Sequence, residues 1–173
     1  MENHVTIKRS HGNGLISSSE IIDLLDLFYK NDSSKFEINF PNGSDPKSKR
    51  GWHLYKGKTK SGLYLHEIFI YEDQIKKDIL DFLPMGGNRI SPNEKIGTAM
   101  VLVHEMRHAD QAMTHLMNNG SGGAFYLGKY KARPCEVDAR RYVDENFEAI
   151  VELFSDERMI YDTERSEQSR MEV

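Results

Sequence analysis

Residues 101–111 read VLVHEMRHADQ, and this stretch decides both the expected fold and the expected chemistry of the chain. The five residues that precede His104 are all apolar, as in a helix that is buried in a core. His104 and His108 are four positions apart, so a helix places both imidazoles on one face. Polar side chains in a buried helix are costly unless they bind a partner. The stretch therefore predicts a buried helix that carries a polar site.

The spacing of His104, Glu105 and His108 is the HExxH pattern, which points to a zinc site (Zn²⁺). Zinc accepts neutral imidazole in tetrahedral sites, and a catalytic site keeps one position for water. Glu105 is displaced by one residue, so it can reach that water instead of the metal. We predict His104 and His108 as zinc ligands and Glu105 as the general base. The alternative is an ordinary helix whose histidines and glutamate face solvent or pair with one another.

A catalytic zinc site needs a third protein ligand, and several residues after His108 are candidates. Glu136 falls early on a second expected helix, and Asp138, two positions later, is the alternative. His115 lies near the same helix face as His108, although a histidine there more often interacts with the helix dipole. Cys135 could bind zinc as a thiolate, but an isolated cysteine beside a helix start is usually a small packed residue.

HExxH followed by a glutamate that opens a helix, with a small residue three positions later (Glu136 and Ala139), resembles the gluzincin branch of the zincin metallopeptidases. The resemblance covers about residues 91–146. The sequence HEMRHADQ, followed by E-x-D-A-R, is also similar to sequences of short metallopeptidases of bacterial, phage and injected-effector type. The resemblance implies His104, His108 and Glu136 as ligands and Glu105 as base.

The chain departs from the gluzincin pattern at one position. The family has an aspartate four residues after its glutamate ligand, whereas this chain has Arg140 there and an acid at Asp138. The departure keeps Asp138 open as the third ligand. Asp110 or Asp138 could also orient a ligand imidazole by accepting its other N–H.

Peptide hydrolysis also needs a donor for the oxyanion, which zincins usually take from Tyr, His or Arg. The candidates in this chain are Tyr126, Tyr130, Arg133, Arg140 and Arg141. In zincins an extended substrate usually pairs with an edge strand above the motif helix, and residues 63–71 are the best candidate for that strand, although they could equally be central.

The remaining pattern predicts an α+β, zincin-like single domain over residues 1–154, followed by a charged tail, 155–173. We expect a mainly antiparallel sheet from strands at 4–8, 36–40, 52–56 and 63–71, the last two joined as a hairpin. Helices are expected at 19–29, from Pro92 with Ser91 as cap to about 117, and from Pro134 to about 154. The basic cluster of residues 47–60 blunts a sheet edge or binds an acidic partner.

Composition narrows the function class. The chain has 173 residues, a formal charge of −4 and one cysteine. A single cysteine forms no internal disulfide, and the negative net charge gives no positive electrostatic field that would attract a nucleic-acid backbone. It has no signal-peptide pattern and no apolar run of membrane-spanning length. We therefore expect no nucleic-acid partner, no membrane insertion, and a cytoplasmic location or delivery into a host cell by a route that needs no signal peptide.

These observations favour a zinc-dependent metallopeptidase, an endopeptidase that acts on a protein or peptide substrate. The alternatives are an inactive zincin fold used as a binding module, and a zinc amidase that acts on a non-protein substrate such as a cell-wall crosslink. A carboxylate-bridged di-iron bundle needs two Glu-x-x-His motifs on four long helices, and the sequence has one such motif.

Overall fold

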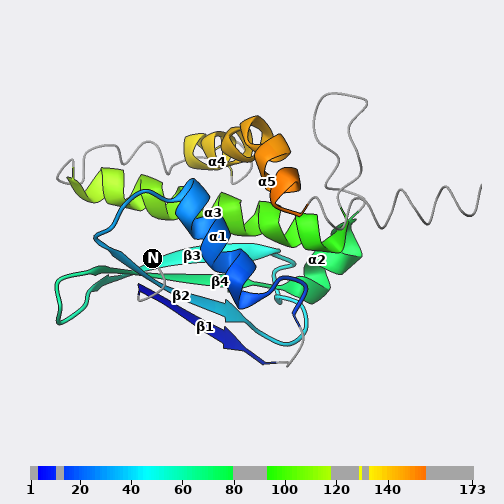
Figure 1. The fold of residues 1–173 in the computed structure, drawn as a ribbon, viewed down its shortest axis with the longest axis horizontal. Helices are drawn as coiled ribbons and strands as arrows, with labels where there is room; N and C mark the ends of the chain where they lie inside the picture. Colours follow the sequence, from blue (N-terminus) through cyan, green and yellow to red (C-terminus); the bar gives the residue numbers. More distant parts are fainter. Residues whose placement is uncertain (1–3, 11–13, 80–92, 118–128, 130–132, 155–173) are drawn as a thin grey trace, which may run out of the picture.

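The computed structural model describes residues 4–10, 14–79, 93–117, 129 and 133–154. These residues combine five helices with one four-stranded sheet, a mixed α and β architecture (Figure 1). The elements in chain order are β1 (Val5–Arg9), α1 (Ser18–Phe28), β2 (Ser34–Phe40), β3 (Gly51–Lys58), β4 (Tyr64–Ile70), α2 (Glu72–Asp78), α3 (Glu94–Met117), α4 (Pro134–Glu145) and α5 (Phe147–Leu153). The short helix α2 was not expected from the sequence pattern.

The sheet has the order β1-β2-β4-β3 and is mixed. β1 pairs with β2 in parallel, β2 pairs with β4 in parallel, and only β3 and β4 pair antiparallel. The expectation of a mainly antiparallel sheet was therefore wrong. The physical reason is that α1 connects β1 to β2 as a crossover, which returns the chain in the same direction. The hairpin then places β4, its second strand, beside β2.

The hairpin of β3 and β4 forms where the sequence predicts it. Its register shifts between Tyr55 and Gly57, and Gly57 has φ of 96°. Such a left-handed conformation costs glycine little, so the bulge falls where the sequence allows it. β4 is paired on both sides, whereas β3 is at the edge of the sheet. Of the two positions left open for residues 63–71, the central one is observed, and the edge position belongs to β3.

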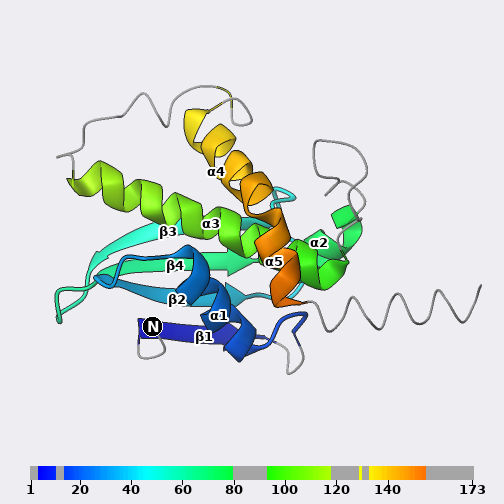
Figure 2. The ribbon, with the colours of Figure 1, turned by 45° about the horizontal axis from the view of Figure 1, so that its top comes forward.

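The helices cover one face of the sheet (Figures 1 and 2). Side chains that alternate along the strands, including Phe36, Ile38, Ile68 and Ile70, are fully buried under α1 and α3. α1 begins with a capping box, in which Ser17 Oγ accepts a hydrogen bond from the backbone N–H of Glu20 and the Glu20 carboxylate accepts one from the backbone of Ser17. α3 lies directly on the sheet, in contact with β3 and β4, and α4 and α5 pack against α3 (Figure 2).

α3 begins at Glu94, two residues later than the sequence predicts. The Oδ1 atom of Asn93 accepts a hydrogen bond of 2.8 Å from the backbone N–H of Ile96, so Asn93 caps the helix. Ser91 and Pro92 lie outside the described residues. Asparagine is as good an N-cap as serine, so the sequence at residues 91–94 is compatible with a helix capped by Ser91 or by Asn93.

The segment expected as one helix from Pro134 to about residue 154 is two helices, α4 and α5. Asn146 separates them with φ of −104° and ψ of 7°. Its side-chain amide donates to the carbonyl of Tyr142, at 2.7 Å, and this local bond competes with the helical ladder. The expected charged tail, residues 155–173, lies outside the described part of the chain. Among the described residues, no helix has the length and apolar character needed to span a membrane.

Candidate metal centre

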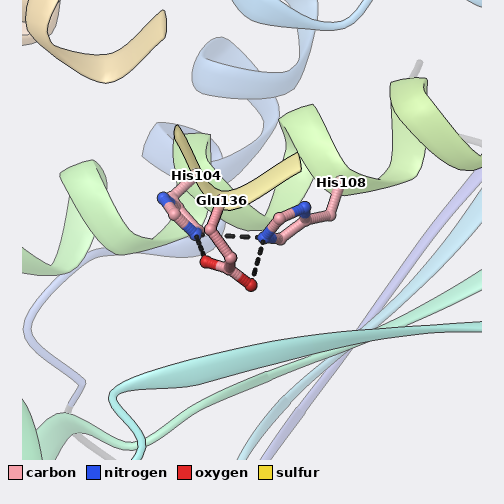
Figure 3. A group of neighbouring side chains, drawn as sticks. All are labelled: His104, His108 and Glu136. Atoms are coloured by element: carbon pink, nitrogen blue, oxygen red, sulfur yellow. Dashed lines mark hydrogen bonds and ion pairs between the residues drawn. The ribbon is translucent and has the colours of Figure 1, made fainter. Parts of the chain in front are cut away.

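His104 and His108 on α3 and Glu136 on α4 converge at one point (Figure 3). Nε2 of His104 lies 3.1 Å from Nε2 of His108. The Glu136 carboxylate lies across both rings, with Oε2 3.3 Å from His104 Nε2 and Oε1 3.5 Å from His108 Nε2. One donor atom from each residue lies within 4.8 Å of the other two. This group could therefore hold a metal ion.

The spacing of these atoms fits a tetrahedral ion. Nitrogen and oxygen ligands about 2.0–2.2 Å from a tetrahedral centre lie about 3.3–3.6 Å from each other. The separations of 3.1, 3.3 and 3.5 Å are close to that range. Two neutral imidazoles and one carboxylate are also a common ligand set for catalytic zinc. The geometry and the donor chemistry both suit a divalent metal.

Gln111 fixes the hydrogen bonding of His108 on the side of the ring that faces away from the three-residue group. Gln111 donates through its amide nitrogen to the carbonyl of Cys135, at 3.0 Å, and to the carboxylate of Asp138, at 2.8 Å. Its amide oxygen is therefore directed at His108 Nδ1, 2.7 Å away, and accepts a hydrogen bond from it. A neutral His108 then has its proton on Nδ1, so Nε2 presents a lone pair towards His104 and Glu136. This lone pair can accept a hydrogen bond from His104 Nε2, 3.1 Å away, or bind a cation placed between the two rings and the carboxylate.

The charges around the imidazole pair also favour a cation. Burial by itself lowers the pKa of His108, but the hydrogen bond to Glu136 and the charge of Glu105 raise the pKa above its ordinary value. Burial raises the pKa of the Glu136 carboxyl, but its hydrogen bonds to His104 and His108 together lower the pKa by more than burial raises it. The pKa of Glu136 therefore lies well below its ordinary value. The carboxylates thus stabilise positive charge at this point, whether a proton or a metal ion carries it.

Asp138 lies beside the three-residue group and serves as a clamp. Its carboxylate accepts hydrogen bonds from Arg107 Nε at 2.8 Å, from Gln111 at 2.8 Å and from Arg141 at 3.1 Å. Burial raises the pKa of Asp138, but these donors lower it below its ordinary value. Asp138 therefore ties α4 to α3, while Glu136 is the acid that the structure places with both histidines. Of the two acids considered for orienting an imidazole, Asp138 acts through Gln111, and Asp110 pairs instead with Arg107 at 2.6 Å.

Glu105 is directed from α3 towards β3 and lines the same cleft as His108 and Glu136. Gly51 of β3 lies directly below it, because a Cβ atom built at Gly51 would come 3.1 Å from Glu105 Oε1 and 2.7 Å from Val101 Cγ1. Burial raises the pKa of Glu105, and the charges of His104 and His108 offset only part of the rise. Neither carboxylate oxygen is among the fully buried atoms without a partner in the described part of the chain. The carboxylate therefore reaches the cleft with a raised pKa.

The cleft has a volume of about 430 Å³ and lies between α3, the start of α4 and the edge strand β3. Five consecutive residues of β3, Gly51 to Tyr55, line it. Side chains alternate along a strand, so a continuous run of lining residues means that the edge backbone faces the cleft. Lys49 and Arg133 bring positive charge to its walls. An extended chain could therefore lie beside β3 and next to the candidate metal centre.

The structure places the other candidates in different positions. His115 lines the cleft, but it is not part of the three-residue group, and Cys135 is buried, with burial raising the pKa of its thiol. Arg140 is exposed on α4, and Arg141 pairs with Asp138 and Glu145. Tyr126 and Tyr130 lie outside the described residues.

Sequence reasoning missed three features of the site. Gln111 is three positions after His108, a spacing that brings two side chains together on a helix, and this signal was available. Gly51 opens a strand, and nothing in the sequence says that a helix crosses it. His53 lines the cleft from β3, and only the packing of the sheet against α3 reveals it.

Comparison of the chain with models of protein families, with curated proteins and with solved structures finds no match.

Proposed function

We propose that this protein is a zinc-dependent metallopeptidase. The observation that carries the proposal is the convergence of His104, His108 and Glu136, of which His108 and Glu136 line the same cleft as Glu105. Two of the proposed metal ligands and a carboxylate with a raised pKa then line one cavity, which suits hydrolysis by an activated water. The resemblance of the HExxH segment to gluzincins supports the same reading.

In the proposed reaction, zinc held by the three ligands supplies the Lewis acidity that makes water a nucleophile near neutral pH. Glu105 accepts one proton of the attacking water at a carboxylate oxygen as the water oxygen bonds to the peptide carbonyl carbon. Glu105 then donates this proton to the amide nitrogen as the C–N bond breaks. A carboxyl with a raised pKa suits both steps, because it holds the proton between them more readily than an ordinary glutamate does.

The substrate that fits best is an extended peptide. β3 is an edge strand whose backbone lines the cleft, and backbone N–H and C=O groups at a free edge can pair with an added strand. Such pairing places a peptide bond of the added chain next to the ligands without selecting one side chain. The position of β3 therefore supports a peptide as the substrate.

The test begins with metal content. We expect wild-type protein purified without added metal to contain about one zinc per chain, and His104→Ala and Glu136→Ala to lose it. Elemental mass spectrometry measures this. A wild-type protein that takes up no zinc, even when zinc is offered, would contradict the proposal.

Activity needs a separate variant. Glu105→Gln keeps the size and polarity of the side chain but cannot accept a proton, so zinc should remain and cleavage of labelled casein should cease. Glu148→Gln, an exposed substitution on α5, is the matched control and should cleave as the wild type does. Equal cleavage by Glu105→Gln and wild type would assign the base elsewhere. Zinc binding without cleavage of peptides or amides would instead favour a binding module.

A further inference from the structure

His53 and His66 form a hydrogen-bonded pair that extends from the core to the cleft. Nε2 of His53 on β3 lies 2.9 Å from Nδ1 of His66 on β4. His66 is fully buried and its ring packs against Phe36, with ring centroids 5.4 Å apart, and near Tyr55, at 5.7 Å. His53 is on the face of β3 that also carries Gly51, and it lines the cleft.

Both imidazoles are neutral near pH 7. Burial lowers the pKa of His66 to about 4. Burial, together with the charges of His66 and His108, lowers the pKa of His53 to about 3. A neutral imidazole has one N–H donor and one acceptor nitrogen. Only one ring of the pair can therefore donate the hydrogen bond between them.

The surroundings of His66 decide which ring donates. Its other nitrogen, Nε2, is fully buried and has no hydrogen-bond partner among the described residues. If His53 donated, the proton of His66 would be on Nε2, as an orphaned N–H in an apolar pocket. Orphaned donors are rarer in proteins than acceptors with an unused lone pair. The favoured arrangement is therefore donation from His66 Nδ1–H to His53 Nε2, which leaves the proton of His53 on its Nδ1.

Nδ1 of His53 is available to a ligand. It is not among the buried atoms without a partner, and within the described ranges no residue bonds to it. The atom therefore keeps access to solvent where the ring lines the cleft. The same cleft contains Glu105, His108 and Glu136.

We propose that His66 is a positioning residue that fixes His53 as the Nδ1–H tautomer. His53 then donates a hydrogen bond from its Nδ1–H to the carbonyl oxygen of a substrate in the cleft. The inference rests on the proposed function, because the oxygen gains negative charge when water attacks the carbonyl carbon. His53 exchanges no proton in this role. A preorganised donor directed at such an oxygen contributes about 100-fold to 1,000-fold in kcat.

The first experiment measures the tautomer and needs neither metal nor substrate. Nitrogen-15 NMR of histidine-labelled protein distinguishes an imidazole protonated on Nδ1 from one protonated on Nε2. We expect His53 as the Nδ1–H form in the wild type. In His66→Phe, where the aromatic pocket keeps a ring, we expect His53 to lose this single form. A wild-type His53 protonated on Nε2 would overturn the proposal.

The second experiment measures binding of an oxyanion to zinc-loaded protein, with inorganic phosphate as the probe. The single tryptophan, Trp52, lines the cleft and reports binding by its fluorescence. We expect His53→Phe to weaken phosphate binding about tenfold or more, because a hydrogen bond to a charged group contributes about 1.5–3 kcal/mol. Zinc affinity should stay within twofold of the wild type.

The control is the His4→Phe variant. His4 precedes β1, at the opposite edge of the sheet, so this variant should bind zinc and phosphate as the wild type does. Unchanged phosphate affinity in zinc-loaded His53→Phe would overturn the role of His53. That result differs from failure of the proposed function, which would appear in the wild type as absence of zinc or of casein cleavage.

Discussion

The side-chain oxygen of Gln111 lies 2.7 Å from Nδ1 of His108, and the Gln111 amide nitrogen donates to Asp138 at 2.8 Å. The two bonds link His108 on α3 to the helix that carries Glu136. They fix the orientation of the amide and, through it, the tautomer of His108. The position of α4 and the state of the histidine are therefore coupled through one glutamine.

Replacing Gln111 should weaken zinc binding. In Gln111→Leu, His108 loses the acceptor that holds its proton on Nδ1, and loss of such a supporting bond typically costs about 10-fold to 100-fold in metal affinity. Competition with a fluorescent zinc chelator measures the change. Gln74→Leu, which removes an amide bonded to Asp78 on α2, is the matched control and should leave zinc affinity unchanged. Equal affinities for Gln111→Leu and wild type would show that the amide does not support the ligand.

The two acids at the start of α4 should differ in their effect on zinc. Glu136→Ala removes a proposed ligand and should abolish tight zinc binding, whereas Asp138→Ala removes the clamp to Arg107 and should weaken zinc binding much less. The same chelator competition compares the variants, and circular dichroism checks that each is folded. The reverse order of affinities would make Asp138 the third ligand.

Gly51→Ala should reduce turnover while zinc stays bound. The new methyl group would lie 2.7 Å from Val101 Cγ1 and 3.1 Å from Glu105 Oε1, so α3 or the carboxylate must move. Overpacking of this kind typically lowers the free energy of unfolding by about 1–3 kcal/mol. Casein cleavage and zinc content, measured on the same sample, separate displacement of Glu105 from loss of the site.

Gly43→Ala controls for the backbone effect of that substitution. Gly43 has φ of 75° and open space where a Cβ atom would lie, so alanine there strains a turn that does not line the cleft. It should lower stability without altering turnover per zinc. Full turnover in Gly51→Ala would mean that the close approach of β3 does not position Glu105.

His66 should make the metal-free protein less stable at acidic pH. An unfolded histidine has a pKa of about 6.5, whereas burial holds the pKa of His66 at about 4. Between these values the unfolded state binds a proton that folded His66 does not, so the free energy of unfolding decreases as the pH falls. The slope contributed by one such histidine is up to about 1.4 kcal/mol per pH unit.

Urea unfolding at pH 7, 6 and 5, with a chelator present, measures this contribution. The free energy of unfolding of His66→Phe relative to wild type should rise as the pH falls through this window, because groups that do not interact with His66 cancel in the difference, and release of His53 from the charge of His66 changes the difference in the same direction. His4→Phe should show a constant difference from wild type. A constant difference for His66→Phe as well would mean that His66 does not stay neutral in the folded state.

Much of the fold could be predicted because the signals are local. The capping box at Ser17 and Glu20, the alternation in β2 and the glycine-flanked hairpin turn each depend on neighbours within a few residues. The split at Asn146 could not be predicted with the same security, because an asparagine is also found inside helices. Helix ends with two good caps, such as Ser91 and Asn93, are ambiguous for the same reason.

The sequence by itself determined that His104 and His108 lie on one face of a buried helix with Glu105 beside them, because a helical repeat is a local property. Only the tertiary structure decided that Glu136 lies at both imidazoles while Asp138 clamps Arg107, since that depends on how α4 docks on α3. It also decided that β3, not β4, is the edge strand, and it brought Gly51 under Glu105 and His53 to the cleft. These relationships join residues more than 25 positions apart, and a contact of that kind is set by the packing of whole elements.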